Sequence, residues 1–178
     1  WKDHGLDRIT IEPLTRARAE RFVTTMLGDD VDPGAHQAVW EKSQGNPMFL
    51  RELVMGAVQD GSLECVRGRW QVAGELTPSD RLTELVATRL TGLTSDESEV
   101  LEHVAFGEPI GLDLLARLCD ATAIESVERN GLVTVQHDGR RSEVRLAHPM
   151  YGEVLRGRTP VLRTRPLCRR LADSVAQP

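Results

Sequence analysis

Histidines, cysteines and acidic residues most often bind metals or perform catalysis, and here their spacing matches no such site. The five histidines lie at positions 4, 36, 103, 137 and 148, without a His-Glu-x-x-His motif or carboxylates at metal-ligand intervals. Cys65, Cys119 and Cys168 form no Cys-x-x-Cys pair, and no Gly-x-Ser-x-Gly motif marks a nucleophile. Three widely spaced cysteines favour free thiols in a reducing compartment, so we expect a cytoplasmic protein.

A phosphate-binding P-loop is also missing from the sequence. Such a loop needs Gly-x-x-x-x-Gly-Lys-Ser/Thr, because its amides approach the phosphates closely and its lysine reaches the terminal phosphates. Lys42-Ser43 is the only Lys-Ser/Thr pair, and Glu41 stands where the second glycine is required. With neither a Walker A nor a Walker B motif, this chain by itself is expected to be no enzyme.

The first informative motif is Gly45-Asn46-Pro47, followed by Met-Phe-Leu-Arg-Glu-Leu. Asn46 is a good N-cap, Pro47 suits the first helical position, and Gly45 permits a sharp turn. Local helix chemistry alone therefore explains the first three residues, and a binding role is the competing interpretation.

The second motif is Ala147-His148-Pro149-Met150-Tyr151, where an expected strand runs directly into a helix. The residue before a proline is held extended, so His148 is fixed at a strand-to-helix corner. A histidine at such a corner can be a packed structural residue or a ligand contact, and both interpretations remain open.

The elements that position these motifs are mostly helical. A short strand is expected over Arg8–Leu14. Apolar periodicity and capping residues predict helices over 15–27, 32–44, from Asn46-Pro47 onward, 80–93, 94–107, 112–119 and 122–130. Alternation predicts a hairpin over 63–66 and 70–72 and a second one over 132–136 and 143–147. Three helices followed by a two-stranded wing is the order of a winged helix. We therefore expect a mainly α fold, with a mostly helical first part followed by a winged-helix domain with a small two-stranded wing.

Charge is distributed unevenly along a chain whose net charge is −5. Residues 139–170 contain nine arginines against two glutamates. The expected recognition helix, Thr122–Asn130, carries Glu125 and Glu128 with only Arg129, which disfavours direct DNA binding by this part. No apolar run reaches the length of a membrane span, so no membrane association is expected, and no signal peptide precedes the first helix.

The ordered set of motifs resembles the STAND class of AAA-related ATPases, and particularly the large ATP-binding LuxR-type transcriptional regulators of bacteria. The resemblance covers nearly the whole chain. It runs from the I-x-I-x-P-L strand through G-N-P-M-F-L-R-E-L, the hairpin ending in Trp70 and R-L-T-E-L-V-A-T-R-L-T-G-L to A-H-P-M-Y-G-E-V-L-R.

The resemblance implies a domain plan. Residues 1–77 would hold the end of a nucleotide-binding domain and the helical lid with its small hairpin. Residues 78–157 would form the winged-helix domain, and residues 158–178 would start a further helical segment. Because the sequence opens at Trp1 without an initiator Met, we expect a larger protein with an upstream P-loop domain and downstream helical and helix-turn-helix domains.

The resemblance also implies binding roles for the two motifs. Pro47 would pack on adenine, with Asn46 and Gly45 shaping its turn, and His148 would contact the β-phosphate of ADP in a closed state. The sequence has Pro149 where the better-known Met-His-Asp form has an aspartate. Arg51 lies later than the usual sensor arginine. ATP or ADP would bind the intact protein, itself an ATPase, while this fragment alone is expected to hold neither.

The function implied is regulatory: the fragment would couple nucleotide state to opening of a transcriptional regulator that can self-associate. Two alternatives stay open. One is a DNA-binding winged-helix module, to which the arginine-rich end could contribute. The other is a purely structural protein-interaction domain without a nucleotide role.

Overall fold

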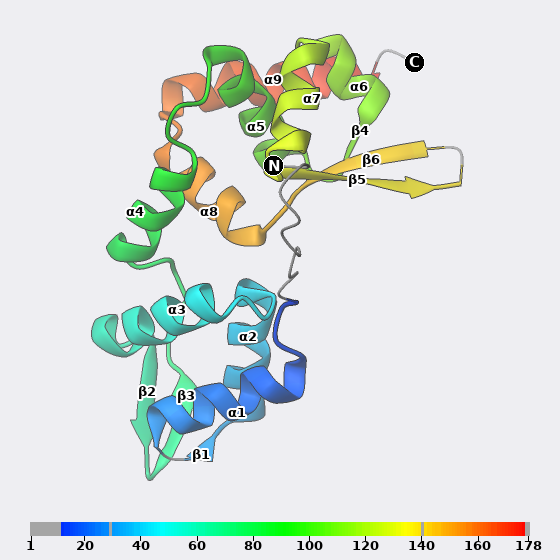
Figure 1. Ribbon diagram of the computed structural model, residues 1–178. Coiled ribbons are helices and arrows are strands. Elements are labelled where there is room, and N and C mark those ends of the chain that lie inside the picture. The colour runs from blue at the N-terminus through cyan, green and yellow to red at the C-terminus, as the bar shows by residue number, and fades with distance from the viewer. Residues whose placement is uncertain (1–11, 29, 140, 177–178) are drawn as a thin grey trace. The chain divides into compact units, whose positions relative to one another are not determined.

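The computed structural model describes residues 12–28, 30–139 and 141–176 of the chain. Among these residues the fold is mainly helical, as the sequence predicts, and contains two small three-stranded sheets (Figure 1). The chain divides into two compact units, Trp1–Thr77 and Pro78–Pro178. The boundary lies between Thr77 and Pro78.

The first unit combines three helices with a small sheet. Its elements, in order, are α1 (Arg16–Leu27), β1 (Asp30–Val31), α2 (Pro33–Ser43), α3 (Pro47–Asp60), β2 (Leu63–Val66) and β3 (Arg69–Val72). The strand order is β1-β3-β2, with β1 parallel and β2 antiparallel to β3. The expected hairpin is thus present, and β1 adds a strand that the sequence does not predict.

Capping and burial explain why α2 and α3 form where they do. Asp32 and Asn46 occupy the N-caps, and each is followed by a proline in the first turn. Leu50, Leu53 and Val54 of α3 are fully buried among the three helices, which makes α3 the centre of this core.

One expectation for the first unit needs correction. The expected strand over Arg8–Leu14 lies largely outside the described residues, and its described part, Glu12–Leu14, is not a strand. The helix expected over 15–27 is present as α1, with Thr15 as its N-cap.

The described residues of the second unit form six helices and a three-stranded sheet, most of which pack on one core. The elements are α4 (Asp80–Arg89), α5 (Ser95–Gly107), β4 (Ile110–Gly111), α6 (Leu112–Leu118), α7 (Ala121–Arg129), β5 (Val133–Asp138), β6 (Arg141–Leu146), α8 (Pro149–Arg158) and α9 (Val161–Ala176). Its sheet is antiparallel with strand order β4-β6-β5. The β5–β6 hairpin projects beyond the helices of the unit (Figure 1).

Helix α5 is the centre of the second unit, contacting α6, α7, α8, α9 and β6. Its N-terminus carries the capping box that the sequence predicts. The Thr94 hydroxyl accepts from the Glu97 N–H at 3.2 Å, and the Glu97 carboxylate accepts from the Thr94 N–H at 2.7 Å. Further along this helix, Val100, Leu101 and Val104 are almost fully buried.

The structure differs from the sequence-based expectation in three places. The sheet has a third strand, β4, pairing Ile110 with Val144, so the expected two-stranded wing is part of a larger sheet. Helix α4 ends at Arg89 rather than near Leu93. Helix α9, expected to start a further segment, supplies Leu167 and Leu171 to the core of the second unit.

Within the described ranges, no helix combines the length and apolar character that crossing a bilayer demands.

Candidate functional site

The turn before α3 explains the glycine of the first motif. Gln44 and Gly45 both have positive φ, of 47° and 74°, which is strained for residues with a side chain. The Gly45 carbonyl accepts a 2.8 Å hydrogen bond from the Leu14 N–H. A Cβ at Gly45 would lie 2.3 Å from the Leu14 carbonyl oxygen, so this close approach requires glycine.

Asn46 and Pro47 form the first turn of α3 as expected. The Asn46 Oδ1 accepts from the N–H groups of Met48 and Phe49 at 3.1 and 3.3 Å. Pro47 is exposed, and the neighbouring Met48 is 46% exposed. These two side chains present an apolar surface at a helix N-terminus, a surface onto which a planar ring can stack.

Arg51, which follows the first motif in α3, has a local role. Its guanidinium pairs with the carboxylate of the adjacent Glu52, whose side chain is almost fully buried. A carboxylate in that position requires a compensating charge, which Arg51 supplies.

His148 is the N-cap of α8, which explains its place at the strand-to-helix corner. Its backbone is extended, and its Nδ1 accepts from the Met150 N–H at 3.1 Å. A ring that accepts through Nδ1 carries its proton on Nε2, so this hydrogen bond selects one tautomer. The Tyr151 ring lies beside it, with centroids 6.2 Å apart and planes inclined at 55°.

The four sequence-predicted site residues therefore fall into two groups. Gly45, Asn46 and Pro47 lie together in the first unit, and His148 lies in the second. Each of the four has a demonstrable role in starting a helix. Nucleotide contact would be an addition to that role.

The α7 helix, the expected recognition helix, retains the acidic character seen in the sequence. Glu125 and Arg129 form an exposed i,i+4 pair at 4.0 Å, and Glu128 is exposed beside them. This surface repels a phosphate backbone rather than attracting it.

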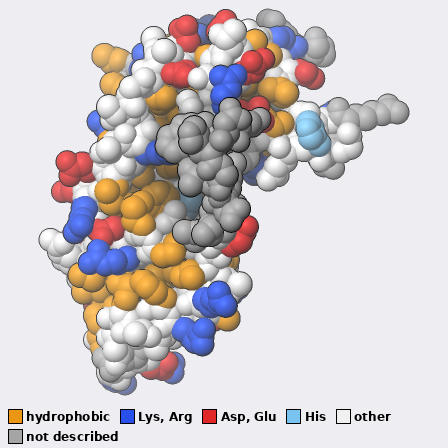
Figure 2. Space-filling model, in the orientation of Figure 1, with side chains coloured by type: hydrophobic (Ala, Val, Ile, Leu, Met, Phe, Trp, Pro, Cys, Tyr) orange, Lys and Arg blue, Asp and Glu red, His pale blue; other side chains and the backbone are white. Residues whose placement is uncertain are grey.

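Most of the described arginines near the C-terminus are engaged by acidic groups. Arg163 and Arg170 of α9 pair with Glu102 and Glu99 of α5, each at 2.6 Å. The further pairs are Arg145–Glu143, Arg156–Glu108 and Arg169–Asp173. On the visible face of the second unit, basic side chains lie among acidic ones and form no continuous basic surface (Figure 2).

Sequence reasoning misses a contact in the second unit between a buried histidine and a half-buried cysteine, Cys119. His103 is fully buried, with Nδ1 2.8 Å from the Glu99 carbonyl oxygen and 3.5 Å from the Cys119 Sγ. Its Nε2 is buried without a hydrogen-bond partner. The only signal in the sequence is the position of His103 between Leu101 and Val104, on the apolar side of a helix.

The chemistry of this pair is unreactive. Burial raises the pKa of the Cys119 thiol to about 11, and the negative charge of Glu99 adds to the shift. At neutral pH the thiol is therefore protonated and a poor nucleophile. No cluster of three or more potential metal ligands occurs in the described parts of the chain.

Comparison of the sequence with protein-family models and with curated proteins found no match in either case.

Proposed function

We propose that this chain is the lid and winged-helix portion of an ATP/ADP-switched transcriptional regulator of the LuxR type. Its role in that protein is to couple the bound nucleotide to opening of the molecule. The upstream P-loop domain would hold the nucleotide, and Pro47 and His148 would add contacts from the two units.

The observation that carries this proposal is the element order of the second unit. Helices α5, α6 and α7 precede the β5–β6 hairpin, and the chain then enters α8 at His148. This order and this corner histidine are what a winged helix with a nucleotide-sensing histidine requires. The Nδ1 cap places the proton of the ring on Nε2, and an N–H donor is the kind of group that a phosphate oxygen accepts from.

The first unit supports the same proposal through the exposed N-terminus of α3. Pro47 presents an apolar ring there, and Asn46 and Gly45 fix its position. The 46% exposure of Met48 widens the apolar surface available to an adenine ring.

The mechanism is a population shift. A ring stack or one charge-assisted hydrogen bond contributes only about 1–3 kcal/mol, so neither residue determines nucleotide affinity alone. If His148 meets ADP only in the closed form, exchange for ATP removes that contact and favours opening. A nucleotide with equal affinity for both forms would shift nothing.

The test uses the intact protein that contains this chain and its preceding domain. ADP is expected to raise its melting temperature, because it binds only the folded form. His148→Asn should keep the N-cap, since Asn accepts the same backbone hydrogen bond, but it removes the Nε2–H donor. The expected result is an unchanged melting temperature without ADP and a smaller shift with ADP.

His148→Ala is the matched control, because it removes both the cap and the ring. It should lower stability without ADP by about 1 kcal/mol and reduce the ADP shift as much as His148→Asn does. If ADP raises the melting temperature of His148→Asn as much as that of the unmodified protein, the phosphate contact is refuted and a structural interaction module is favoured. Absence of a Walker A motif in the coding sequence ahead of Trp1 would refute the nucleotide switch altogether.

Direct DNA binding by this chain is the weaker alternative, and two observations argue against it. Glu125 and Glu128 occupy the exposed side of α7, and the α9 arginines Arg163 and Arg170 are paired with α5. Salt-dependent DNA binding by the chain would nevertheless reverse this preference.

A further inference from the structure

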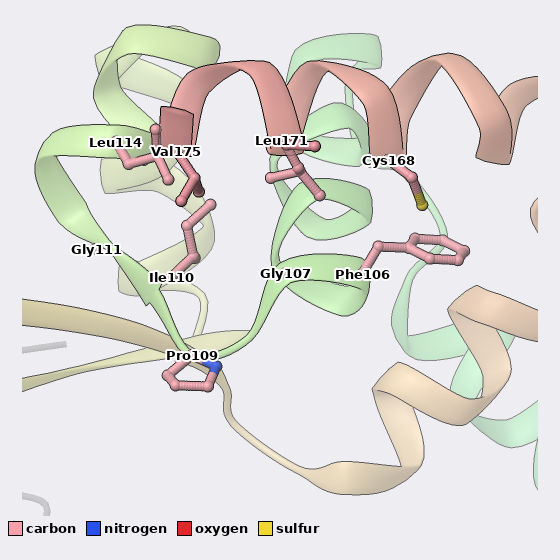
Figure 3. A pocket seen from close by; sticks show the side chains of 10 residues that line it. Phe106, Gly107, Pro109, Ile110, Gly111, Leu114, Cys168, Leu171 and Val175 are labelled. Atoms are coloured by element: carbon pink, nitrogen blue, oxygen red, sulfur yellow. The ribbon is translucent and has the colours of Figure 1, made fainter. Parts of the chain in front are cut away.

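A hollow in the second unit is lined almost entirely by apolar side chains. It lies between the C-terminal end of α5, strand β4, α6 and α9, and its volume is about 580 Å³. Pockets that bind small molecules range over about 300–1,000 Å³, so its size is suitable for one. Figure 3 shows Cys168 and Leu171 of α9 pointing toward the segment that carries Phe106 and Ile110.

The floor of the hollow is buried and its rim is exposed. Ile110 and Leu171 are 2% and 8% exposed, while Val175 is 71% exposed. A Cβ at Gly107 would lie 3.2 Å from Leu171, so glycine at this position keeps the floor clear. Solvated apolar surface next to a packed floor is favourable for binding an apolar group.

One end of the hollow continues into a polar groove. Gly111, Leu114 and Val175 line both, and the groove adds the side chains of Arg117 and Arg141. The hydroxyl residues Ser142 and Ser174 lie there too. The site is therefore divided into an apolar part and a part with guanidinium and hydroxyl groups.

The charged side chains that line the groove are the basic Arg117 and Arg141 and the acidic Asp113 and Glu143. Arg145 engages Glu143 at 3.3 Å, which leaves two guanidinium groups against the one carboxylate of Asp113. Arg117 makes only a long 3.5 Å hydrogen bond to the Ser174 carbonyl, which leaves most of its donors for another acceptor. A planar guanidinium matches the geometry of a carboxylate.

We propose that this site binds a small amphipathic carboxylate, with its apolar chain over Ile110 and Leu171 and its carboxylate at Arg117 and Arg141. The arrangement identifies a ligand with a medium-length hydrocarbon body and one acidic head. This inference does not depend on the nucleotide switch, since every residue involved lies in the second unit and none belongs to the two motifs.

The test titrates decanoate, decanol and butyrate into the full chain and follows binding by calorimetry and by amide NMR shifts. Decanoate is expected to bind saturably at one site and to shift amides of α6 and α9. Butyrate should bind much more weakly because it lacks the apolar body, and decanol should bind more weakly because it lacks the carboxylate.

Variants separate the two ends of the site. Arg117→Gln should weaken decanoate about tenfold and leave decanol unchanged, because a charge-assisted hydrogen bond is lost. Ala172→Phe, at an exposed lining position, should weaken both ligands by filling the hollow. Arg165→Gln is the matched control: Arg165 lies exposed on the same helix outside the lining, and its variant should bind normally.

Several results would overturn the proposal. The first is the absence of saturable decanoate binding, and the second is equal affinity for decanoate and decanol. The third is an equal loss of decanoate affinity in Arg117→Gln and Arg165→Gln. If Ala172→Phe does not fold, Val175→Glu replaces it, since this 71% exposed position tolerates charge and would repel the carboxylate. Unchanged decanoate binding by Val175→Glu would also refute the site.

Discussion

His103 places an imidazole ring in the fully buried centre of the second unit. The Nδ1 lies 2.8 Å from the Glu99 carbonyl oxygen, so Nδ1 carries the proton and donates to it. The Nε2 lone pair is then left buried without a partner. A buried polar atom without a partner reduces stability, because it has given up hydrogen bonds to water and gained none.

Replacing this ring with a hydrocarbon side chain should therefore stabilise the protein. His103→Leu is expected to raise the free energy of unfolding by about 1 kcal/mol, since it removes the unpartnered Nε2 at similar volume. Urea denaturation of the full chain, followed by circular dichroism, measures the change. A loss of more than about 1 kcal/mol would instead mean that the Glu99 and Cys119 contacts outweigh the buried lone pair.

At the scale of elements, Glu97 joins two helices. Its carboxylate completes the α5 capping box and accepts a 2.5 Å hydrogen bond from the Ser126 hydroxyl of α7. The Ser126 hydrogen bond, followed by the Thr94 N–H hydrogen bond, holds the pKa of Glu97 below its usual range. Because the folded pKa is lowered, this contribution to stability is present above the unfolded pKa and is lost in acid.

Glu97→Gln should therefore destabilise the chain near neutral pH and much less in acid. The difference in free energy of unfolding between the variant and the unmodified chain should shrink as the pH falls below about 4.3, the ordinary pKa of glutamate. It should keep shrinking as the pH falls through the lowered pKa of Glu97 in the folded state. Urea denaturation at a series of pH values measures it. A difference that stays constant with pH would show that the charge of Glu97 does not contribute. Ser126→Ala is the control, expected to reduce the same acid dependence.

The helices and the two hairpins could be predicted because their signals are local. Asp32 and Asn46 sit beside prolines, and Thr94 stands three residues before Glu97, so each helix start can be identified within a few residues. Strands β1 and β4 could not be predicted in this way. Each contains two residues, Asp30–Val31 and Ile110–Gly111, and alternation needs a longer run.

Contacts between distant segments could not be predicted either, because the signals in the sequence are local. The arginines of α9 appear in the sequence as an excess of positive charge. Their pairing with Glu99 and Glu102, 71 and 61 residues away, appears only in the folded chain. The role of His148 as a cap could be anticipated from its corner position, but the choice of Nδ1 as acceptor could not.

At the scale of the whole molecule, each unit has its own core and its own optical signal. The described tryptophans, Trp40 and Trp70, lie in the first unit, and the single tyrosine of the sequence, Tyr151, lies in the second. Fluorescence from tryptophan therefore reports on the first unit, while circular dichroism reports on both.

This separation allows a prediction about unfolding. Leu171→Ala removes a buried side chain of the second core and should lower its stability by about 2–4 kcal/mol. The denaturation midpoint from circular dichroism should fall, and the midpoint from tryptophan fluorescence should stay unchanged. Leu162→Ala, on the same helix but 89% exposed, should change neither midpoint. Equal shifts of both midpoints in Leu171→Ala would indicate one cooperative unit.

The position of α9 has a consequence for synthesis on the ribosome. Leu167 and Leu171 complete the core around α5, yet they are translated at least sixty residues after the end of that helix. The ion pairs between α5 and α9 span 61 and 71 residues. Until α9 emerges, part of the apolar side of α5 has no partner. The second unit therefore finishes folding only after α9 has been translated, and until then we expect its exposed apolar surface to attract chaperones.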